Sequence, residues 1–498
     1  MDVVYSSKPL WAVLVSMIAA FLILATGEKR RNIRESWTIL AALAKFVIVF
    51  SMIPVVLQGK VIEYTLVTFY PGLMLQFRVD AFGMLFGVIA SSLWIATSFY
   101  SIGYVRKLKE HAQSRYFFAF AMCLSSTMGI AFSGNLLTFL VFYEILTIAT
   151  WPLVIHKETP EAIIGGRKYL TYTLVAGCTL LFAVAMIYFL TGTLDFKAGG
   201  FLQGHAASDG VLIFLFVILI LGFGVKAGIM PMHEWLPTAM VAPTPVSALL
   251  HAVAVVKAGV FGCLRVILYV YGPDLLHDLG LWILLAYFVS ITVLVAGFLA
   301  LGQDHLKRRL AFSTINNLAM IILGAVLLTK SSMTGGILHM ANHAFMKITL
   351  FMCAGAIYAK THKDHVSQLN GLGKQMPLTM GAFAIAAVGL SGIPPMNGFI
   401  SKWFLCLGAI EAHEIVFLFV FFTSAMLDVA FLFPIVYNSF FKKPMDDVVP
   451  HFDEAPMLMV VPLSITALLS LVFGIAPDAF VQFFSITSLA VQNILGVG

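Results

Sequence analysis

Charged residues are scarce in this sequence: Asp, Glu, Lys and Arg make up 11% of its 498 residues, whereas hydrophobic residues make up 60%. The mean hydropathy is +0.96. A water-soluble chain of this length cannot bury so much apolar surface, so the composition excludes a soluble protein and indicates a polytopic membrane protein. The formal net charge of +6 does not indicate nucleic-acid binding, because the basic residues lie in short connections beside the apolar runs.

Cysteine is also scarce, and its spacing carries no metal or redox motif. The five cysteines are scattered through apolar segments without a CxxC pair: Cys123, Cys178, Cys263, Cys353 and Cys406. This spacing offers neither iron–sulfur ligation nor a disulfide framework. The sequence also lacks a dinucleotide-binding glycine motif and a phosphate-binding loop. We therefore expect no bound cofactor and no metal; the residues leave open whether the chain serves an enzyme complex.

Long apolar runs dominate instead. A helix needs about 20 apolar residues to cross the hydrocarbon core. About fourteen stretches qualify: 10–26, 37–58, 81–104, 116–134, 136–155, 168–191, 210–230, 241–266, 280–300, 311–329, 334–358, 376–405, 413–439 and 456–475. The first run has no small-residue cleavage site and is followed by positive charges, so it predicts a retained helix. Residues 64–70 favour strand, which predicts a surface hairpin within 59–80.

The predicted fold is therefore an all-α polytopic membrane domain covering residues 1–498, and its basic residues predict an orientation. With the N-terminus outside, nineteen Lys and Arg residues fall in inner connections and five in outer ones. Positive residues concentrate on the cytoplasmic side of membrane proteins. An even number of spans then places both termini outside.

Two of the predicted spans carry helix-breaking residues. One contains KAGIMP at 226–231 and the other contains SGIPPMNG at 391–398. Proline removes a backbone hydrogen bond and glycine loosens a helix, so both spans are predicted to be discontinuous. They are five spans apart, and a five-helix unit repeated in tandem returns inverted. This spacing predicts two inverted repeats, at about 116–266 and 280–440.

Each predicted discontinuous span also holds a lysine, and a charge inside the bilayer costs from about 3 to well over 10 kcal/mol. Lys226 lies at the first break and Glu144 lies in a neighbouring span. A carboxylate that approaches and leaves a buried lysine would make it bind and release a proton. The alternative is a fixed ion pair that only locks two helices together.

Lys257 lies well inside a third span, too deep to reach the membrane surface. The prolines at 243 and 245 suit the start of this helix, about four turns before Lys257. On a regular helix His251 points about 120° away from Lys257. His251 is therefore either a functional group or a core histidine with satisfied hydrogen bonds.

His339, His343 and Lys347 follow one another at intervals of four residues. They share one helix face, as the relay groups of a proton pathway would. Two histidines at this spacing also suit zinc, but no carboxylate or thiol accompanies them and the HExxH pattern is absent. A third alternative is that they only hydrogen-bond neighbouring helices together.

Lys402 follows the second break, and either lines the pathway or extends to the outer surface. Asp428 is a further acid in an apolar span. By the repeat spacing it falls on the helix that corresponds to that of Lys257, and the sequence assigns it no role.

Five segments together resemble the antiporter-like proton-channel family. They are NLLTFLVFYE at 135–144, KAGIMPMHEWLP at 226–237, APTPVSALLH at 242–251 followed by Lys257, NHAFMK at 342–347 and GIPPMNGFISK at 392–402. The family includes the large antiporter-like subunits of respiratory complex I, the A and D subunits of Mrp-type cation/proton antiporters, and the matching subunits of membrane-bound hydrogenases. The resemblance covers about residues 80–470.

The resemblance implies one proton channel, built of two inverted half-channels that a polar axis joins at mid-membrane. Glu144 and Lys226 would be its input pair, Lys257 its central relay, and Lys402 its exit group. His339, His343 and Lys347 would continue the axis. Some members carry glutamate at the exit, where this chain has lysine. The sequence ends soon after its last predicted span, so we expect no long lateral helix and a closest similarity to the D subunit of Mrp antiporters.

The resemblance further implies that the chain works with other subunits in the cytoplasmic (inner) membrane of a bacterium or archaeon. The expected partners are other membrane subunits and the lipid bilayer, with protons as the transported ion and Na⁺ as a second candidate. Two alternatives remain at this stage. The first is a non-conducting scaffold whose charges only hold helices together. The second is the proton-channel partner of a bicarbonate-uptake system.

Overall fold

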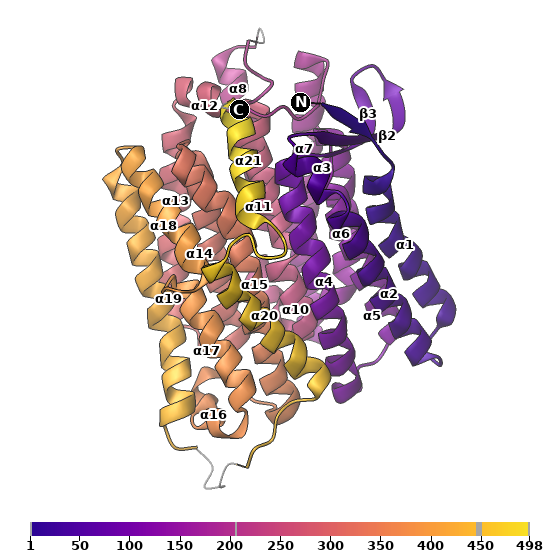
Figure 1. Ribbon diagram of the computed structural model, residues 1–498, viewed down its shortest axis with the longest axis vertical. Coiled ribbons are helices and arrows are strands. Elements are labelled where there is room, and N and C mark those ends of the chain that lie inside the picture. The colour runs from indigo at the N-terminus through magenta and orange to yellow at the C-terminus, as the bar shows by residue number, and fades with distance from the viewer. Residues whose placement is uncertain (1, 205–206, 445–450, 497–498) are drawn as a thin grey trace.

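The computed structural model describes residues 2–204, 207–444 and 451–496. The chain forms a bundle of helices that run mostly along its long axis, with a small sheet at one end (Figure 1). Both ends of the chain lie at that same end of the bundle (Figure 1). We refer to it as the terminal end and to the other as the loop end.

The helices of the first half of the chain include α8 and α11, which pack against each other. They are α1 (Lys8–Thr26), α2 (Arg31–Phe50), α3 (Ile53–Leu57), α4 (Ala81–Leu108), α5 (Gln113–Ala131), α6 (Leu136–Val154), α7 (Pro160–Thr191), α8 (Asp209–Ala227), α9 (Trp235–Thr238), the 3-10 turn η1 (Ala239–Val241), α10 (Thr244–Ala252), α11 (Val255–Arg265) and the π-helical segment η2 (Val266–Tyr271).

The helices of the second half surround α15, which packs against α10, α14, α17 and α18. They are α12 (Pro273–Asp278), α13 (Leu281–Leu301), α14 (Leu306–Val326), α15 (Lys330–Thr361), the 3-10 turn η3 (Val366–Leu369), α16 (Leu372–Gln375), α17 (Pro377–Ser391), α18 (Asn397–Glu411), α19 (Ile415–Phe441), α20 (Met457–Ile475) and α21 (Phe483–Leu495).

Each of the fourteen predicted spans falls on helix, but within the described residues only twelve helices are long and apolar enough to cross a membrane. The other two predicted spans differ for identifiable reasons. The span at 116–134 becomes α5, in which Arg115 and several serines dilute the apolar residues. The span at 376–405 is divided into α17 and α18, of 15 residues each. Helix α21 lies beyond the last predicted span.

The predicted hairpin is present, and it belongs to a three-stranded sheet. Strands β2 (Val61–Tyr70) and β3 (Leu73–Val79) pair antiparallel, and β1 (Val3–Tyr5) pairs parallel with β2. The outer half of β2 is exposed and its first residues are buried. The sheet lies at one side of the terminal end of the bundle, and the other described elements are helices (Figure 1).

Both predicted helix interruptions are present, and each begins at a glycine. Helix α8 ends before Gly228 and α17 ends before Gly392, whose φ angles are +75° and +79°. Glycine adopts this left-handed conformation without the steric cost that a Cβ brings. A third interruption was not predicted: α10 ends at Ala252 and α11 begins at Val255, in a stretch without glycine or proline.

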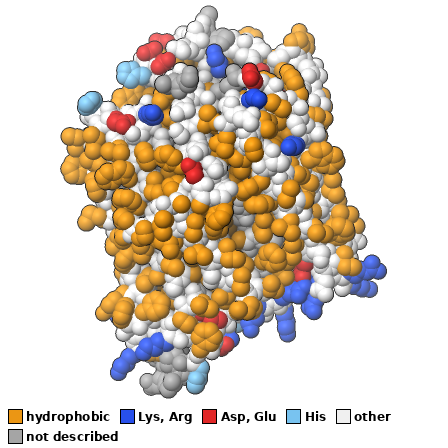
Figure 2. All heavy atoms as spheres, viewed as in Figure 1, with side chains coloured by type: hydrophobic (Ala, Val, Ile, Leu, Met, Phe, Trp, Pro, Cys, Tyr) orange, Lys and Arg blue, Asp and Glu red, His pale blue; other side chains and the backbone are white. Residues whose placement is uncertain are grey.

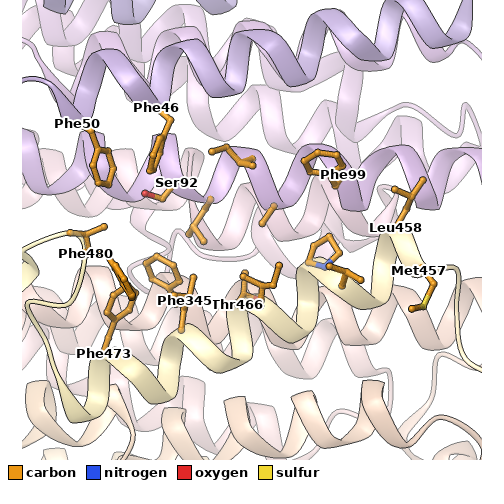
Figure 3. A pocket seen from close by; sticks show the side chains of 18 residues that line it. Phe46, Phe50, Ser92, Phe99, Phe345, Met457, Leu458, Thr466, Phe473 and Phe480 are labelled. Atoms are coloured by element: carbon orange, nitrogen blue, oxygen red, sulfur yellow. The ribbon is translucent and has the colours of Figure 1, made fainter.

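The surface divides into zones along the long axis. On the face in Figure 2, apolar side chains cover the middle and most charged side chains gather near the two ends, as expected for a bundle surrounded by lipid. On this apolar surface a groove of about 640 Å³ runs between α4 and α20. Figure 3 shows its lining, which is almost entirely apolar and includes Phe46, Phe99, Phe345 and Phe473.

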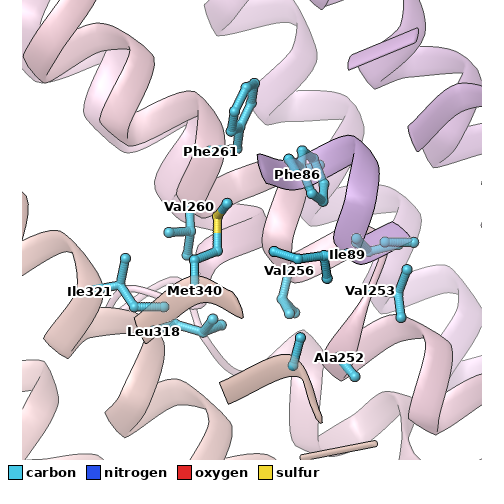
Figure 4. Close-up of a cluster of buried hydrophobic side chains, with 14 of the residues drawn as sticks. Phe86, Ile89, Ala252, Val253, Val256, Val260, Phe261, Leu318, Ile321 and Met340 are labelled. Carbon is cyan, nitrogen blue, oxygen red and sulfur yellow. The ribbon is translucent and has the colours of Figure 1, made fainter. Parts of the chain in front are cut away.

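The interior of the bundle is packed with apolar side chains where α4, α11, α14 and α15 meet. Figure 4 shows part of this cluster, with Phe86, Val256, Val260, Leu318 and Met340 labelled. All five side chains are fully buried. Of the titratable side chains described next, Lys257 lies on α11 and His339, His343 and Lys347 lie on α15, so apolar groups that cannot solvate a charge surround much of this set.

Candidate functional site

Lys226 is fully buried at the C-terminal end of α8, directly before the first helix interruption. Its Nζ donates a hydrogen bond to the backbone carbonyl of Tyr143, at 2.6 Å, and lies 3.3 Å from the centroid of the Tyr143 ring. A carbonyl dipole and an aromatic face therefore stabilise the ammonium. Neither group carries the full negative charge of a carboxylate.

Glu144 lies half-buried on α6, next to Tyr143, and its carboxylate faces α7. A Cβ at Gly177 of α7 would lie 2.4 Å from Glu144 Oε1, so the carboxylate occupies space that this glycine leaves free. In the described part of the chain, Oε1 has no hydrogen-bond partner and no ion pair joins Glu144 to Lys226. The expected input pair is therefore not in contact, because the Tyr143 carbonyl holds the lysine.

Lys257 is in contact with His343, which connects α11 to α15. Lys257 Nζ and His343 Nδ1 are 2.9 Å apart, and both side chains are fully buried. Gly259 allows the close approach of α11 to the end of α8, because a Cβ there would lie 2.3 Å from the backbone nitrogen of Ala227. The helices that carry Lys226 and Lys257 therefore pack directly against each other.

His251 occupies a different position from the one that a regular helix predicts. The interruption at Val253 and Ala254 separates it from Lys257, so the expected angle of about 120° does not apply. Its ring stacks on Phe351 of α15 with centroids 4.7 Å apart. Among the described residues neither of its ring nitrogens has a hydrogen-bond partner. His251 thus stays a candidate site residue.

The three titratable groups of α15 contact different helices. His339 hydrogen-bonds Ser401 Oγ of α18 through Nδ1, at 2.8 Å, and Asn317 Oδ1 of α14 through Nε2, at 3.1 Å. Lys347 Nζ donates to Ser313 Oγ of α14, at 2.6 Å. The rings of His339 and His343 are 6.0 Å apart between centroids. The stripe predicted from the spacing is therefore buried, and each of its three groups contacts a polar group on a neighbouring helix.

Lys402 forms an ion pair with Asp428, and their closest N–O distance is 2.7 Å. The Lys402 side chain is 9% exposed and that of Asp428 is fully buried, so the interpretation of Lys402 as a surface-reaching lysine is wrong. The lysine stem packs over Gly392 at the helix interruption, where a Cβ would lie 2.7 Å from Lys402 Cδ. Asn317 Nδ2 donates to Asp428 Oδ1 at 3.4 Å and so links this pair to His339.

Sequence reasoning missed the partner of Lys402 and the neutral groups between the charges. Asp428 was visible as an acid in an apolar span, but its partner depends on how α18 packs against α19. Asn317, Ser313 and Ser401 gave no signal, since single neutral polar residues are common in membrane helices. Lys45 is another fully buried lysine; its Nζ donates to the Leu124 carbonyl at 2.9 Å.

Comparisons with known proteins agree with this architecture. Residues 133–427 match the membrane family described as NADH:quinone oxidoreductase/Mrp antiporter. A probable K⁺/H⁺ antiporter A/B subunit from Rhizobium meliloti is 31% identical over 92% of this chain, which spans 46% of that protein. The N subunit of the NADH-quinone oxidoreductase of Desulforudis audaxviator is 29% identical, over 79% of this chain and 81% of its own length. The match confirms the resemblance seen in the motifs.

A solved structure supports the same fold. A chain of the Mrp complex from a Dietzia species superposes with a TM-score of 0.87, at 20% identity, over 98% of this chain and 97% of its own. At such an identity the likeness establishes the fold alone. The protein is therefore a multi-pass, mostly helical membrane protein.

Proposed function

The chain belongs to the NADH:quinone oxidoreductase/Mrp antiporter membrane family, and from its geometry we propose that it is a proton-translocating, antiporter-like subunit of a multi-subunit membrane complex. Protons move along buried Lys, Glu and His side chains and the water between them. Na⁺ is the second candidate ion, exchanged against protons. The site residues are Glu144, Lys226, Lys257, His251, His339, His343, Lys347 and Lys402, to which the geometry adds Asp428.

The observation that carries this proposal is the polar connection through the centre of the bundle. It runs from Lys257 to His343 on α15, and from His339 through Asn317 to Asp428 and Lys402. Two steps of the proposed pathway lack a hydrogen bond among the described residues: the step from Lys226 to Lys257, whose helices pack together, and the step between the two histidine rings, which are 6.0 Å apart between centroids. One water molecule or a ring rotation spans such a gap. A proton relay needs this continuity, whereas helix packing alone does not.

In the input half of the proposed channel, the charge of Lys226 can change without breaking an ion pair. Lys226 is held by a carbonyl and a ring, and Glu144 lies beside it without contact. A shift of either side chain toward the other stabilises the charged lysine, and a shift away favours its release of a proton. Moving one charge across the membrane is worth about 2.3 kcal/mol per 100 mV, which such a change of partner can match.

We assign the orientation and internal symmetry to the same proposal. Both termini lie outside the cytoplasmic membrane of a bacterium or archaeon, and the half-channels are the inverted repeats at about 116–266 and 280–440. The position of both chain ends at the terminal end supports an even number of crossings (Figure 1). The glycine interruptions in α8 and α17 support the repeat.

The partners are other membrane subunits that supply energy, since the described helices contain no nucleotide-binding or redox motif. Relatives whose names make them parts of antiporters and oxidoreductases favour this arrangement. Glu144 lies near a surface where Ile148 of α6 and Val175 of α7 are 65% and 63% exposed. A neighbouring subunit that covers this surface would be in contact with the input group.

The test is proton uptake by the purified complex in vesicles. We expect Glu144→Gln and Lys226→Met each to abolish nearly all uptake while the complex still assembles. Lys45→Met is the matched control, because this buried lysine lies outside the connected groups, and it should keep most of the uptake. Full uptake in both site variants would leave the scaffold interpretation as the better one.

A further inference from the structure

Two loops meet at the loop end of the bundle and bring together three side chains of metal-ligating type. Glu110 and His111 lie in the loop between α4 and α5, and His156 lies between α6 and α7. One ligand atom from each residue lies within 4.8 Å of the others. No sequence motif indicates this cluster, because its two parts are more than forty residues apart.

His156 is the unusual member, because its side chain is fully buried and both of its ring nitrogens lack a hydrogen-bond partner among the described residues. Its ring stacks on that of His111, with centroids 4.9 Å apart, and meets the edge of Tyr116. Nε2 lies 3.8 Å from Glu110 Oε2, too far for a hydrogen bond. Buried polar atoms in proteins are nearly always paired, so these nitrogens call for a ligand.

The loop that carries His156 is fixed by an arginine of α5. Arg115 donates to the His156 carbonyl at 3.2 Å and forms an ion pair with Glu158 at 2.5 Å. The loop is thus held in place, and the positive charge nearest to it is already neutralised.

We propose that Glu110, His111 and His156 bind a divalent transition metal ion of the Zn²⁺ class. Two imidazoles and one carboxylate are a donor set that zinc favours, and a fourth position remains for water. Zinc–ligand distances of about 2.0–2.2 Å require the three donor atoms to move closer together. The exposed His111 and the loop residue Glu110 can make that movement. Glu158 lies 3.7 Å from His111 Nε2 but stays with Arg115.

The bound ion would link the loop between α4 and α5 to the end of α6, the helix that carries Glu144. Beside it, Lys157 lies over the Tyr358 ring at 5.6 Å and lines a polar pocket of about 110 Å³ with Lys307 and His305. The site does not depend on the proposed function, since its residues lie outside the connected groups of the bundle centre. The test of this site therefore measures metal binding and not ion transport.

The experiment titrates the tag-free, metal-stripped full chain in detergent with Zn²⁺, by calorimetry and by competition with a chromophoric chelator. We expect one Zn²⁺ per chain. His111→Gln and Glu110→Gln should each weaken binding by more than about tenfold, since even groups that only hydrogen-bond to a metal ligand are worth about 10- to 100-fold in affinity. His413→Gln is the matched control, an exposed loop histidine at the terminal end, and should leave the affinity unchanged.

A second measurement keeps the result independent of folding defects. Zn²⁺ should raise the thermal unfolding temperature of the wild type, because a ligand that binds only the folded state stabilises it. The rise should be absent in His156→Gln. In the absence of metal, His111→Gln should unfold at the same temperature as the wild type. The proposal is overturned if the wild type binds no stoichiometric Zn²⁺, or if His111→Gln binds as tightly as His413→Gln.

Discussion

The two interrupted helices solve the same problem, a buried lysine beside a glycine break, in different ways. At the first, Lys226 donates to the Tyr143 carbonyl, and Glu144 lies nearby without contact. At the second, Lys402 lies against Asp428 at 2.7 Å, and Asn317 supports the carboxylate. A carbonyl dipole leaves the charge of the lysine in place, whereas a carboxylate neutralises it.

Lys226 is therefore held without a counter-ion in contact, whereas Lys402 is held in an ion pair. Changing the protonation of Lys226 breaks no ion pair, so modest movements of Glu144 suffice to alter it. Deprotonating Lys402 would leave Asp428 as an uncompensated buried charge, which is costly. In the proposed pathway, Lys226 is therefore the group suited to start a proton transfer, and Lys402 needs a proton or a movement of α19 before it can release one.

The largest expected effect concerns stability. Asp428→Asn leaves Lys402 buried without its counter-ion, and breaking a buried pair by removing one partner costs about 3–5 kcal/mol. Glu144→Gln should change the stability far less, because this half-buried carboxylate has no ion-pair partner in the described structure. Thermal unfolding in detergent compares the two variants. Equal losses would mean that both halves hold their lysine in the same way.

The double variant Lys402→Met/Asp428→Asn separates locking from transport. Replacing both partners of a buried pair by uncharged groups is often neutral for stability, so most of the loss in Asp428→Asn should be recovered. Proton uptake should nevertheless be lost, because Lys402, the proposed exit group, is gone. A scaffold predicts the reverse, since its function requires only the stability. Uptake close to that of the wild type in the double variant would therefore exclude Lys402 from the pathway.

A smaller effect should come from the position of Glu144. In Gly177→Ala the new methyl group would lie 2.4 Å from Glu144 Oε1, so the carboxylate must move. Because the carboxylate is the far end of a flexible, half-buried side chain, its movement should cost little stability, whereas proton uptake should fall. Gly381→Ala is the control, because a Cβ at that glycine meets no atom within 4 Å. Unchanged uptake in Gly177→Ala would show that the exact place of the carboxylate does not matter.

The sequence correctly predicted those features that depend on the residues of a single segment. The glycines and prolines at 226–231 and 391–398 marked both interruptions, and strand-forming residues marked the hairpin at 59–80. The break between His251 and Lys257 was missed because Val253 and Ala254 are ordinary helix residues, so its cause lies in packing.

Contacts between different helices could not be predicted from the sequence. The four-residue spacing correctly placed His339, His343 and Lys347 on one stripe, since that depends on a single helix. Which carboxylate meets which lysine depends on how each helix is rotated toward its neighbours. Helical spacing within one span carries no information on that rotation, so Asp428 was left without a partner.

The smallest expected effect tests how Lys226 is held. Tyr143→Phe keeps both the backbone carbonyl and the aromatic face that Lys226 contacts, and removes a hydroxyl whose bond to the Gly222 carbonyl is long, at 3.4 Å. We expect stability and uptake close to those of the wild type. Tyr143→Leu removes the ring, and a desolvated cation–π contact is worth about 2 kcal/mol. Its uptake should fall below that of Tyr143→Phe, because a less stabilised ammonium loses its proton more readily. If both variants transport alike, the carbonyl alone holds the lysine and the ring contributes only packing.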